Sequence, residues 1–228
     1  MTMTKKEIFS KIAFYVILAT LFLICATTVV LLAAGYKIDF KNRKITQTGI
    51  IIVKTLDKDY QIYIDEKFIE KEEAVVRNLT PGFYEVQIKK EGYQTFTESF
   101  YLNPGEAKII NNIVLFLESP IVEEFSEQIK IPFEELADTG NLLMSDRELF
   151  VNNSFLTRFE SRIQDASWYP NDRFVGITVD NRFSILDIDT LNEFYLFEKK
   201  SNTPVIFINS GKTVIFESEG NTFSAQIR

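Results

Sequence analysis

Two carboxylates in the C-terminal half of the chain have a spacing that supports chemistry. Asp187 and Asp189 lie two residues apart in an extended segment, which places both side chains on one face of a strand. Such a pair can hold Ca²⁺, or serve as the acid and base of a carboxylate-based, glycan-active enzyme. The alternative is a solvated turn, which is the interpretation we favour, so we predict neither a metal nor a cofactor.

The residue types exclude most other catalytic classes. The chain contains no His, and its only Cys, Cys25, lies within an apolar run. His-based triads, His zinc sites and thiol catalysis are therefore excluded. Residues 210–213 resemble the end of a phosphate-binding loop, but the upstream Gly and the following helix are missing. The sequence predicts a non-enzymatic protein with no catalytic residues.

The longest apolar run covers residues 12–34 and contains no charge, Pro or Gly. As a helix it is long enough to cross a hydrocarbon core of about 30 Å, and its Thr hydroxyls can bond to the preceding turn. A cleaved signal peptide is the alternative, but its apolar stretch is shorter, and Leu32 weakens the only cleavage motif. We expect a retained transmembrane helix, with a tail at 1–11 and a juxtamembrane segment at 35–47.

Charge is distributed unevenly along the chain, whose net charge is −7. Residues 1–47 hold seven Lys and Arg against two Asp and Glu, so residues 48–228 carry −12. An acidic body repels phosphate backbones, which excludes nucleic acid as a partner. The expected partner of the basic segment and its apolar run is the lipid bilayer.

Residues 48–117 read as a small antiparallel β-sandwich, because short apolar runs alternate there with turn residues. The clearest run is 83–89, where polar and apolar residues alternate as in a half-buried strand. Asn103-Pro104-Gly105 predicts a turn in which Gly supplies a positive φ. The other expected strands are 50–53, 60–64, 74–76, 95–102 and 109–117.

This segment resembles the PEGA domain, a small surface β-sandwich module. The residues that carry the resemblance are Leu79, Pro81, Gly82, Tyr84, Val86, Ile88, Gly92 and Tyr93. The upstream half departs from the family, because the Pro-Glu-Gly-Ala tetrapeptide is absent and an Asp-Gly turn has become Asp65-Glu66. We read the motif as structural: Gly82 with positive φ in a type II turn, Gly92 with positive φ or a close approach, and Tyr93 in the core.

A linker is predicted at 118–136, followed by a second β-rich module at 137–228. Trp168 to Arg173 can be aligned with Phe207 to Lys212 at an offset of 39, and Trp168 and Pro170 belong to a motif that resembles bacterial propeller repeats. The strands would make about two and a half β-propeller-like blades, fewer than a closed ring needs. The module would be open, truncated or completed by another chain, with 222–227 as an exposed edge strand.

The expected fold is thus an all-β soluble part after one N-terminal transmembrane helix. Flanking charge does not orient the helix, but long downstream domains translocate largely regardless of it, and the PEGA resemblance implies the outer side of a bacterial membrane. We expect a cytoplasmic N-terminus, residues 36–228 outside, and a binding or scaffold protein of the cell envelope with an envelope glycan or another envelope protein as partner. The alternatives are a glycan-active enzyme and a signalling or assembly subunit that recruits a partner strand.

Overall fold

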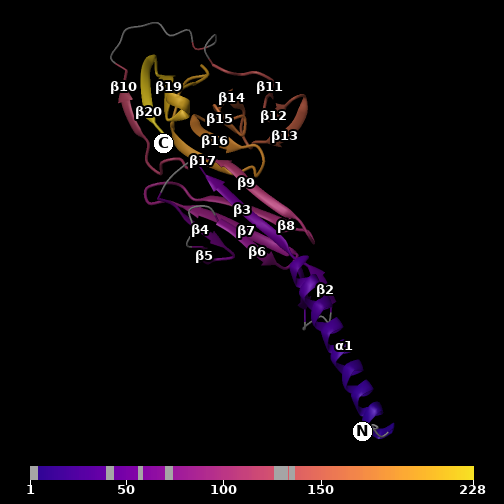
Figure 1. Ribbon diagram of the computed structural model, residues 1–228. Coiled ribbons are helices and arrows are strands. Elements are labelled where there is room, and N and C mark those ends of the chain that lie inside the picture. The colour runs from indigo at the N-terminus through magenta and orange to yellow at the C-terminus, as the bar shows by residue number, and fades with distance from the viewer. Residues whose placement is uncertain (1–4, 40–43, 56–58, 70–73, 126–132, 134–136) are drawn as a thin grey trace. The chain divides into compact units, whose positions relative to one another are not determined.

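The computed structural model describes the chain except for residues 1–4, 40–43, 56–58, 70–73, 126–132 and 134–136 (Figure 1). Within the described ranges, the elements are helix α1 (Lys5–Ala33), twenty β-strands that follow it, and one short 3-10 helix. The chain folds into two compact units. Unit 1 comprises Met1–Val53, Val75–Phe83 and Tyr101–Ile109, whereas unit 2 comprises Lys54–Ala74, Tyr84–Phe100 and Ile110–Arg228.

Helix α1 is apolar on all sides over Ile12–Ala33, and this stretch is long enough to cross a membrane. Most of its large apolar side chains are exposed. The Thr hydroxyls each donate to the carbonyl four residues earlier at 2.8 Å: Thr20 to Val16, Thr27 to Leu23 and Thr28 to Ile24. The predicted satisfaction of these hydroxyls is therefore confirmed.

A hairpin that the sequence did not predict connects α1 to the first long strand. Its strands are β1 (Tyr36–Asp39) and β2 (Lys44–Gln47), paired antiparallel within the predicted juxtamembrane segment. At its base, the carbonyl of Gly35 accepts two hydrogen bonds from Thr48, from the backbone N–H and from Oγ1, both at 2.7 Å. The helix end is thus fastened directly to the residue that precedes β3.

The next strands form two sheets, and residues 48–117 are β-rich as predicted. One sheet has the order β6-β3-β9 and the other has the order β5-β4-β7-β8. The strands are β3 (Gly49–Thr55), β4 (Gln61–Ile64), β5 (Lys67–Ile69), β6 (Ala74–Leu79), β7 (Gly82–Lys89), β8 (Phe96–Leu102) and β9 (Ala107–Ile113). In β7, Val86 and Ile88 are fully buried while Glu85 is exposed, which confirms the alternation expected from its sequence.

The turn between β8 and β9 contains a charged hydrogen-bond acceptor. Gly105 has a φ of 73°, which confirms the prediction for this turn. The backbone N–H and Nδ2 of Asn103 donate to Oε2 of Glu106 at 2.7 and 2.8 Å. These two bonds lower the pKa of Glu106 below its ordinary value of 4.5, because they favour the ionised carboxylate.

We expect this turn to lose stability in acid. A lowered pKa in the folded state means that the stabilisation is present above pH 4.5 and is lost as the pH falls through the folded-state pKa. Glu106→Gln should remove this part of the acid dependence. The check is to compare the thermal midpoints of the two chains between pH 6 and pH 3, and parallel curves would contradict the expectation.

The rest of unit 2 contains three antiparallel sheets. A three-stranded sheet has the order β11-β12-β13, and two four-stranded sheets have the orders β14-β15-β16-β17 and β10-β20-β19-β18. The strands are β10 (Ile121–Glu124), β11 (Leu142–Ser145), β12 (Glu148–Val151), β13 (Ser154–Arg158), β14 (Ile163–Trp168), β15 (Phe174–Val179), β16 (Arg182–Asp187), β17 (Glu193–Glu198), β18 (Ile206–Ile208), β19 (Thr213–Ser218) and β20 (Asn221–Gln226), with the 3-10 helix η1 at Asn209–Gly211. No closed propeller is formed by the strands that are described.

Two sequence-based expectations are corrected here. The segment predicted as a linker contains β10, which pairs with β20 in the register Ile121↔Gln226. The last strand is therefore not an exposed edge, because β20 lies between β10 and β19. The sequence missed this pairing because β10 is only four residues long and its partner lies about a hundred residues away.

The β14–β17 sheet packs on both of its faces, which explains why its strands are almost continuously buried. One face packs against the β11–β13 sheet through a cluster of buried residues: Leu142, Leu149, Ile163, Ala166, Val175, Ile177 and Leu186. The other face meets the β18–β20 strands through stacked rings, with Phe197 and Phe216 at 4.4 Å between centroids. The β11–β13 sheet, the β14–β17 sheet and the sheet that contains β18–β20 thus form a stack of three.

Candidate functional site

The PEGA-like motif residues lie around the β6–β7 turn and the end of β7. Leu79 ends β6, and Gly82 and Tyr84 belong to β7. Gly82 does not have the positive φ that we predicted, so the type II turn is wrong. The nearest residue with a left-handed backbone is Asn78, near the end of β6, with a φ of 59°. Asn tolerates that conformation better than other side chains do, which relieves Gly82 of the role.

We expect Gly82→Val to change the free energy of unfolding by less than about 0.5 kcal/mol, since no atom lies closer than 4.0 Å to the added Cβ. The matched control is Gly105→Val, in which a Cβ would lie 2.9 Å from the amide of Gln47 at a φ of +73°. That change should cost about 1–3 kcal/mol. Urea unfolding of both variants checks the pair, and equal losses would contradict our assignment of the turns.

The two remaining PEGA-like positions have different outcomes. Gly92 has a φ of 76°, which confirms the prediction of a positive φ. Tyr93 was expected in the core but is only half-buried, with the ammonium of Lys90 4.5 Å from its ring centroid and a β-bridge to Leu117. The ring of Tyr93 therefore lies at the surface, where it makes a cation–π contact with Lys90 instead of packing in the core.

Trp168 and Pro170 mark the turn between β14 and β15. Trp168 is half-buried, and its Nε1 donates to Oδ1 of Asn141 at 3.1 Å, while Pro170 is exposed. Trp168 also borders a cavity of about 330 Å³, whose other lining residues are Asp138, Gly140, Asn141, Val151, Asn152, Asp172 and Ile188. An indole next to carboxylates and amides can take a polar ligand that has an apolar face.

Asp187 does not lie in a solvated turn, so our favoured interpretation of the Asp187-Asp189 pair is wrong. The side chain of Asp187 is fully buried. Arg173 donates two hydrogen bonds to it, from Nη2 to Oδ2 at 2.8 Å and from Nε to Oδ1 at 3.1 Å. Asp189 is largely exposed, and its Oδ2 lies 3.5 Å from the same Nε. Both carboxylates therefore face one guanidinium instead of facing each other across a cleft.

The guanidinium of Arg173 also connects to strands β8 and β9. Its Nη2 lies 3.3 Å from Oε2 of the buried Glu98, and its Nη1 donates to the carbonyl of Asn111 at 2.8 Å. Burial by itself lowers the pKa of Arg173, but the hydrogen bonds and charges of Asp187 and the charges of Glu98 and Asp189 outweigh it. The net pKa is raised above the ordinary value, so Arg173 remains charged.

Three amide side chains join the same elements near this cluster. Asn192 donates to the carbonyl of Thr97, Gln94 donates to the carbonyl of Tyr195 at 2.7 Å, and Asn171 donates to the carbonyl of Asn112 at 3.3 Å. Together with Arg173 they tie β8, β9 and the segment just before β8 to β16, β17 and the turns that precede β15 and β17 within unit 2. This arrangement holds two sets of strands together, and its charges are already paired.

A second buried ion pair lies inside the sheet stack. Nζ of Lys199 lies 2.7 Å from Oδ2 of Asp165, and both side chains are almost fully buried. Lys199 also donates to the carbonyl of Ser201 at 2.9 Å. Such a pair is costly to break and, like the Arg173 cluster, it specifies packing. No group of three potential metal-binding side chains occurs among the residues that the structure describes.

The β11–β13 sheet exposes large apolar side chains on its outer face. Its outer face presents one cross-strand row, in which Leu143 pairs with Phe150 and Phe150 pairs with Phe155. Leu143 is 52% exposed and Phe155 is 59% exposed, although both are large apolar residues. Among the described strands, no fourth one lies beside β13, whereas the other two sheets of the stack have four strands each. We call the row and the outer side of β13 the open sheet.

Comparison with known families assigns part of the chain. Residues 48–114 match the PEGA domain family, in agreement with the resemblance. The match begins at Thr48, the residue that holds the end of α1, and it ends within the region predicted for this module. The chain matches none of the curated proteins with which it was compared.

Sequence reasoning missed the residues that dominate this site. Arg173 belongs to the repeated turn and aligns with Lys212, which is exposed, so the repeat gave no sign of burial. Its partner Glu98 lies 75 positions earlier, on an alternating strand that shows an acidic residue on its apolar face. That break in the alternation was the available signal, because a carboxylate on a buried face requires a cation.

Proposed function

We propose that this chain is a membrane-anchored, extracytoplasmic binding or scaffold protein of the bacterial cell envelope, without enzymatic activity. It would recruit another envelope protein through the open sheet. The observation that carries the proposal is the exposed row Leu143–Phe150–Phe155 beside a strand edge that no described strand covers.

The open sheet suits a partner strand. An edge strand offers unpaired backbone groups, and native proteins usually protect such edges with charges, bulges or a cover. Strand β10, the edge of another sheet, carries Glu123 and Glu124. Strand β13 instead places Phe155 and Leu156 along its middle, with Arg158 at its end. A partner strand would extend the sheet to four strands and cover the apolar row.

The chemistry of the buried carboxylates supports a binding role over a glycan-active enzyme. A glycosidase needs two carboxyl groups about 5–10 Å apart on opposite sides of a substrate cleft. Asp187 is fully buried and bonded to Arg173, so it has no access to a substrate. Asp189 is exposed, but it contacts the same guanidinium.

The anchor and the orientation rest on α1 and on the PEGA match. The span Ile12–Ala33 suits a bilayer, and the Gly35–Thr48 hydrogen bonds connect it to the folded domain without a free linker. The orientation follows from the PEGA resemblance, which implies a module on the outer side of a bacterial membrane. We therefore keep the N-terminal tail in the cytoplasm and residues 36–228 outside.

A photocrosslinking amino acid at position 155 tests the recruitment of a partner in intact cells. We expect one discrete product of higher mass, which is absent when the purified protein is irradiated alone. The matched control is position 68, where Phe68 is 51% exposed on β5. The same product from both positions, or none from position 155, would contradict the proposal.

Labelling with a membrane-impermeant maleimide tests the orientation. Phe68→Cys in a Cys25→Ser background should react on intact cells, or on spheroplasts where an outer membrane is present. Reaction only after lysis would place the folded modules in the cytoplasm.

A second candidate function is glycan binding in the cavity beside Trp168. The cavity combines an indole with Asp138, Asn152 and Asp172, which are groups that hydrogen-bond to hydroxyls. Titration of the purified chain with envelope glycan fragments should then change the fluorescence of Trp168, which is the only Trp in the sequence. An unchanged spectrum at saturating glycan would exclude this function.

A further inference from the structure

The charges of the chain also divide between the two units. Unit 1 holds nine Lys and Arg against three Asp and Glu, a net charge of +6. Unit 2 holds 16 against 29, a net charge of −13. The basic charge therefore extends beyond the tail and the juxtamembrane segment, to Arg77 on β6 and Lys108 on β9.

Unit 1 also contains the most exposed aromatic side chain among the large apolar residues of the folded domain. Phe83 is 82% exposed, and its ring meets that of Tyr101, which is 49% exposed, with 5.1 Å between centroids. On β7 and β8 these two residues alternate with the buried positions, so they point away from the core. We call Phe83 and Tyr101 the ring pair.

The ring pair lies at the end of unit 1 from which α1 leaves. Asn78, five positions before Phe83, lines a hollow together with Leu32 and Tyr36 at the end of the helix. Leu102, the neighbour of Tyr101, packs against Gly49, where an added Cβ would come within 2.7 Å of its side chain. Both rings therefore lie within five positions of a residue that lines the hollow at the helix end or packs at the start of β3.

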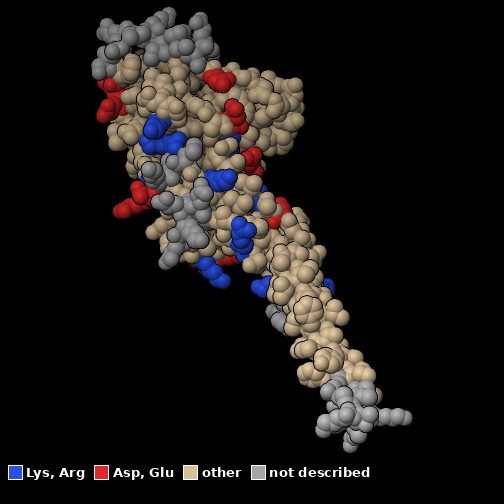
Figure 2. All heavy atoms as spheres, in the orientation of Figure 1, with Lys and Arg blue, Asp and Glu red and all other residues tan. Residues whose placement is uncertain are grey.

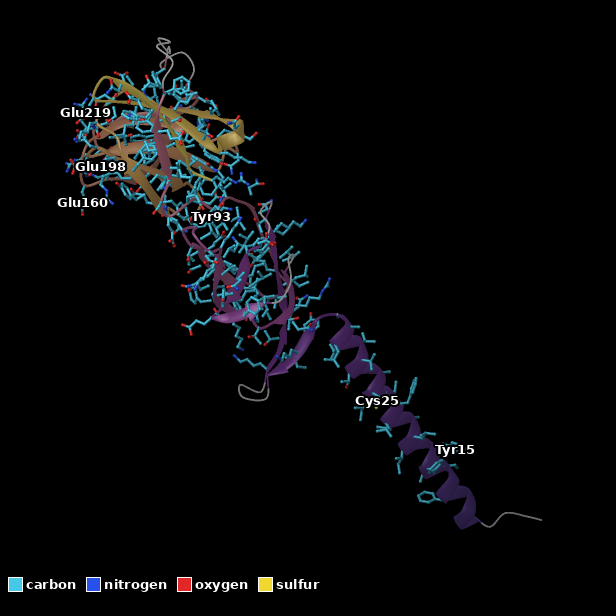
Figure 3. The ribbon with its side chains drawn as sticks, turned by 90° about the vertical axis from the view of Figure 1, so that its left-hand side faces the viewer. Tyr15, Cys25, Tyr93, Glu160, Glu198 and Glu219 are labelled. Atoms are coloured by element: carbon cyan, nitrogen blue, oxygen red, sulfur yellow. The ribbon has the colours of Figure 1, made fainter. Side chains whose placement is uncertain are left out.

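Basic and apolar groups surround the helix end. Lys37 and Lys44 are exposed on the hairpin, and Ile45 beside them is 59% exposed. Figure 2 shows Lys and Arg gathered around the base of the helix on the face drawn, and Figure 3 shows Tyr15 and Cys25 projecting from the helix itself. Aromatic rings with Lys and Arg are the groups that proteins place at the headgroup level of a bilayer.

We propose that the ring pair and the basic residues of unit 1 that follow α1 form a second membrane contact, in which Phe83 and Tyr101 enter the headgroup region of an anionic lipid surface. The inference rests on the proposed membrane anchor, because α1 brings this end of the domain to the bilayer. Exposed rings in a unit of net positive charge suit anionic lipid, since the rings gain an apolar environment while the charges meet lipid phosphates. The net charge of −13 on unit 2 disfavours the same surface.

Spin-label accessibility on the full-length chain tests this contact. Phe83→Cys in a Cys25→Ser background is labelled and reconstituted into vesicles of phosphatidylcholine and phosphatidylglycerol. We expect the label to be accessible to oxygen and shielded from a water-soluble nickel reagent. The matched control is Phe155→Cys, another exposed Phe on a strand, which should remain open to nickel.

The outcomes separate the contact from the anchor. A label on the native Cys25 reports on α1, and its exposure to nickel would overturn the anchor and the contact together. A buried Cys25 label with a nickel-accessible label at position 83 would overturn only the contact. Shielding of position 83 from both reagents, with spin–spin broadening, would also overturn it, because the ring pair would then face a second copy. Replacing Arg77 and Lys108 by Glu should reduce the immersion of position 83.

Discussion

Replacing Arg173 by Met should lower the free energy of unfolding by about 3–5 kcal/mol, the range for breaking a buried ion pair by removing one partner. The physical reason is that Asp187, which has no exposed surface, would keep its charge after losing the guanidinium that it contacts, and the buried Glu98 would lose its ion pair with the same group. Methionine fills a similar volume, so lost packing contributes little. Urea unfolding of the full-length chain in detergent gives the difference.

Two further variants separate this effect from a general loss of surface charge. Arg158→Met removes a 57% exposed guanidinium that lies 3.9 Å from Glu148, and it should change stability by at most about 0.5 kcal/mol. Arg173→Lys should be more stable than Arg173→Met but less stable than the unchanged chain, because an ammonium cannot reproduce both hydrogen bonds of the guanidinium to Asp187. If Arg173→Met and Arg158→Met were equally stable, the cluster would have no role in joining the strands.

Lys199→Met should cost a similar amount, about 3–5 kcal/mol, because it leaves the carboxylate of Asp165 inside the sheet stack without its ammonium partner. The double variant Lys199→Met with Asp165→Leu should recover much of the loss, since both charges are then replaced by apolar groups. The control is Lys200→Met, which removes an exposed ammonium bonded to Glu219 at 2.8 Å and should change stability little. If the double variant were no more stable than Lys199→Met, the loss would not come from the charge of Asp165, and our explanation would be wrong.

The parts of the fold that could be predicted are those governed by local pattern. The apolar run at 12–34 became α1, and the alternation of β7 and the Gly105 turn follow from neighbouring residues. The aligned segments Trp168 to Arg173 and Phe207 to Lys212 each cover a turn between two neighbouring strands, but the propeller-like repeat itself stays a prediction. These features depend on period and turn chemistry, which a single sequence displays.

The features that escaped prediction depend on distant partners. Strand β10 exists because β20 pairs with it, and the burial of Asp187 depends on Arg173. Gly82 shows a different limit, because a Pro-Gly pair fits several turns and Asn78 takes the left-handed conformation instead. The hairpin turn Asp180-Asn181 is different again: both residues have a positive φ, 51° and 61°, and this kind of turn has a local sequence signal that does not depend on distant partners.

The pairing of β10 with β20 has a consequence for the order of folding. Most neighbouring strands of the stack are joined by short hairpins. Their contacts join residues close in sequence and therefore form quickly. Ile121 and Gln226 must instead close a loop of about a hundred residues, whose entropic cost grows with its length. Because about a hundred residues separate the two strands, β10 is synthesised well before its partner and stays unpaired while the intervening strands are made. The pairing of β10 with β20 is therefore a late event in the folding of this sheet, and until then the segment around Ile121 is open to a chaperone or a protease.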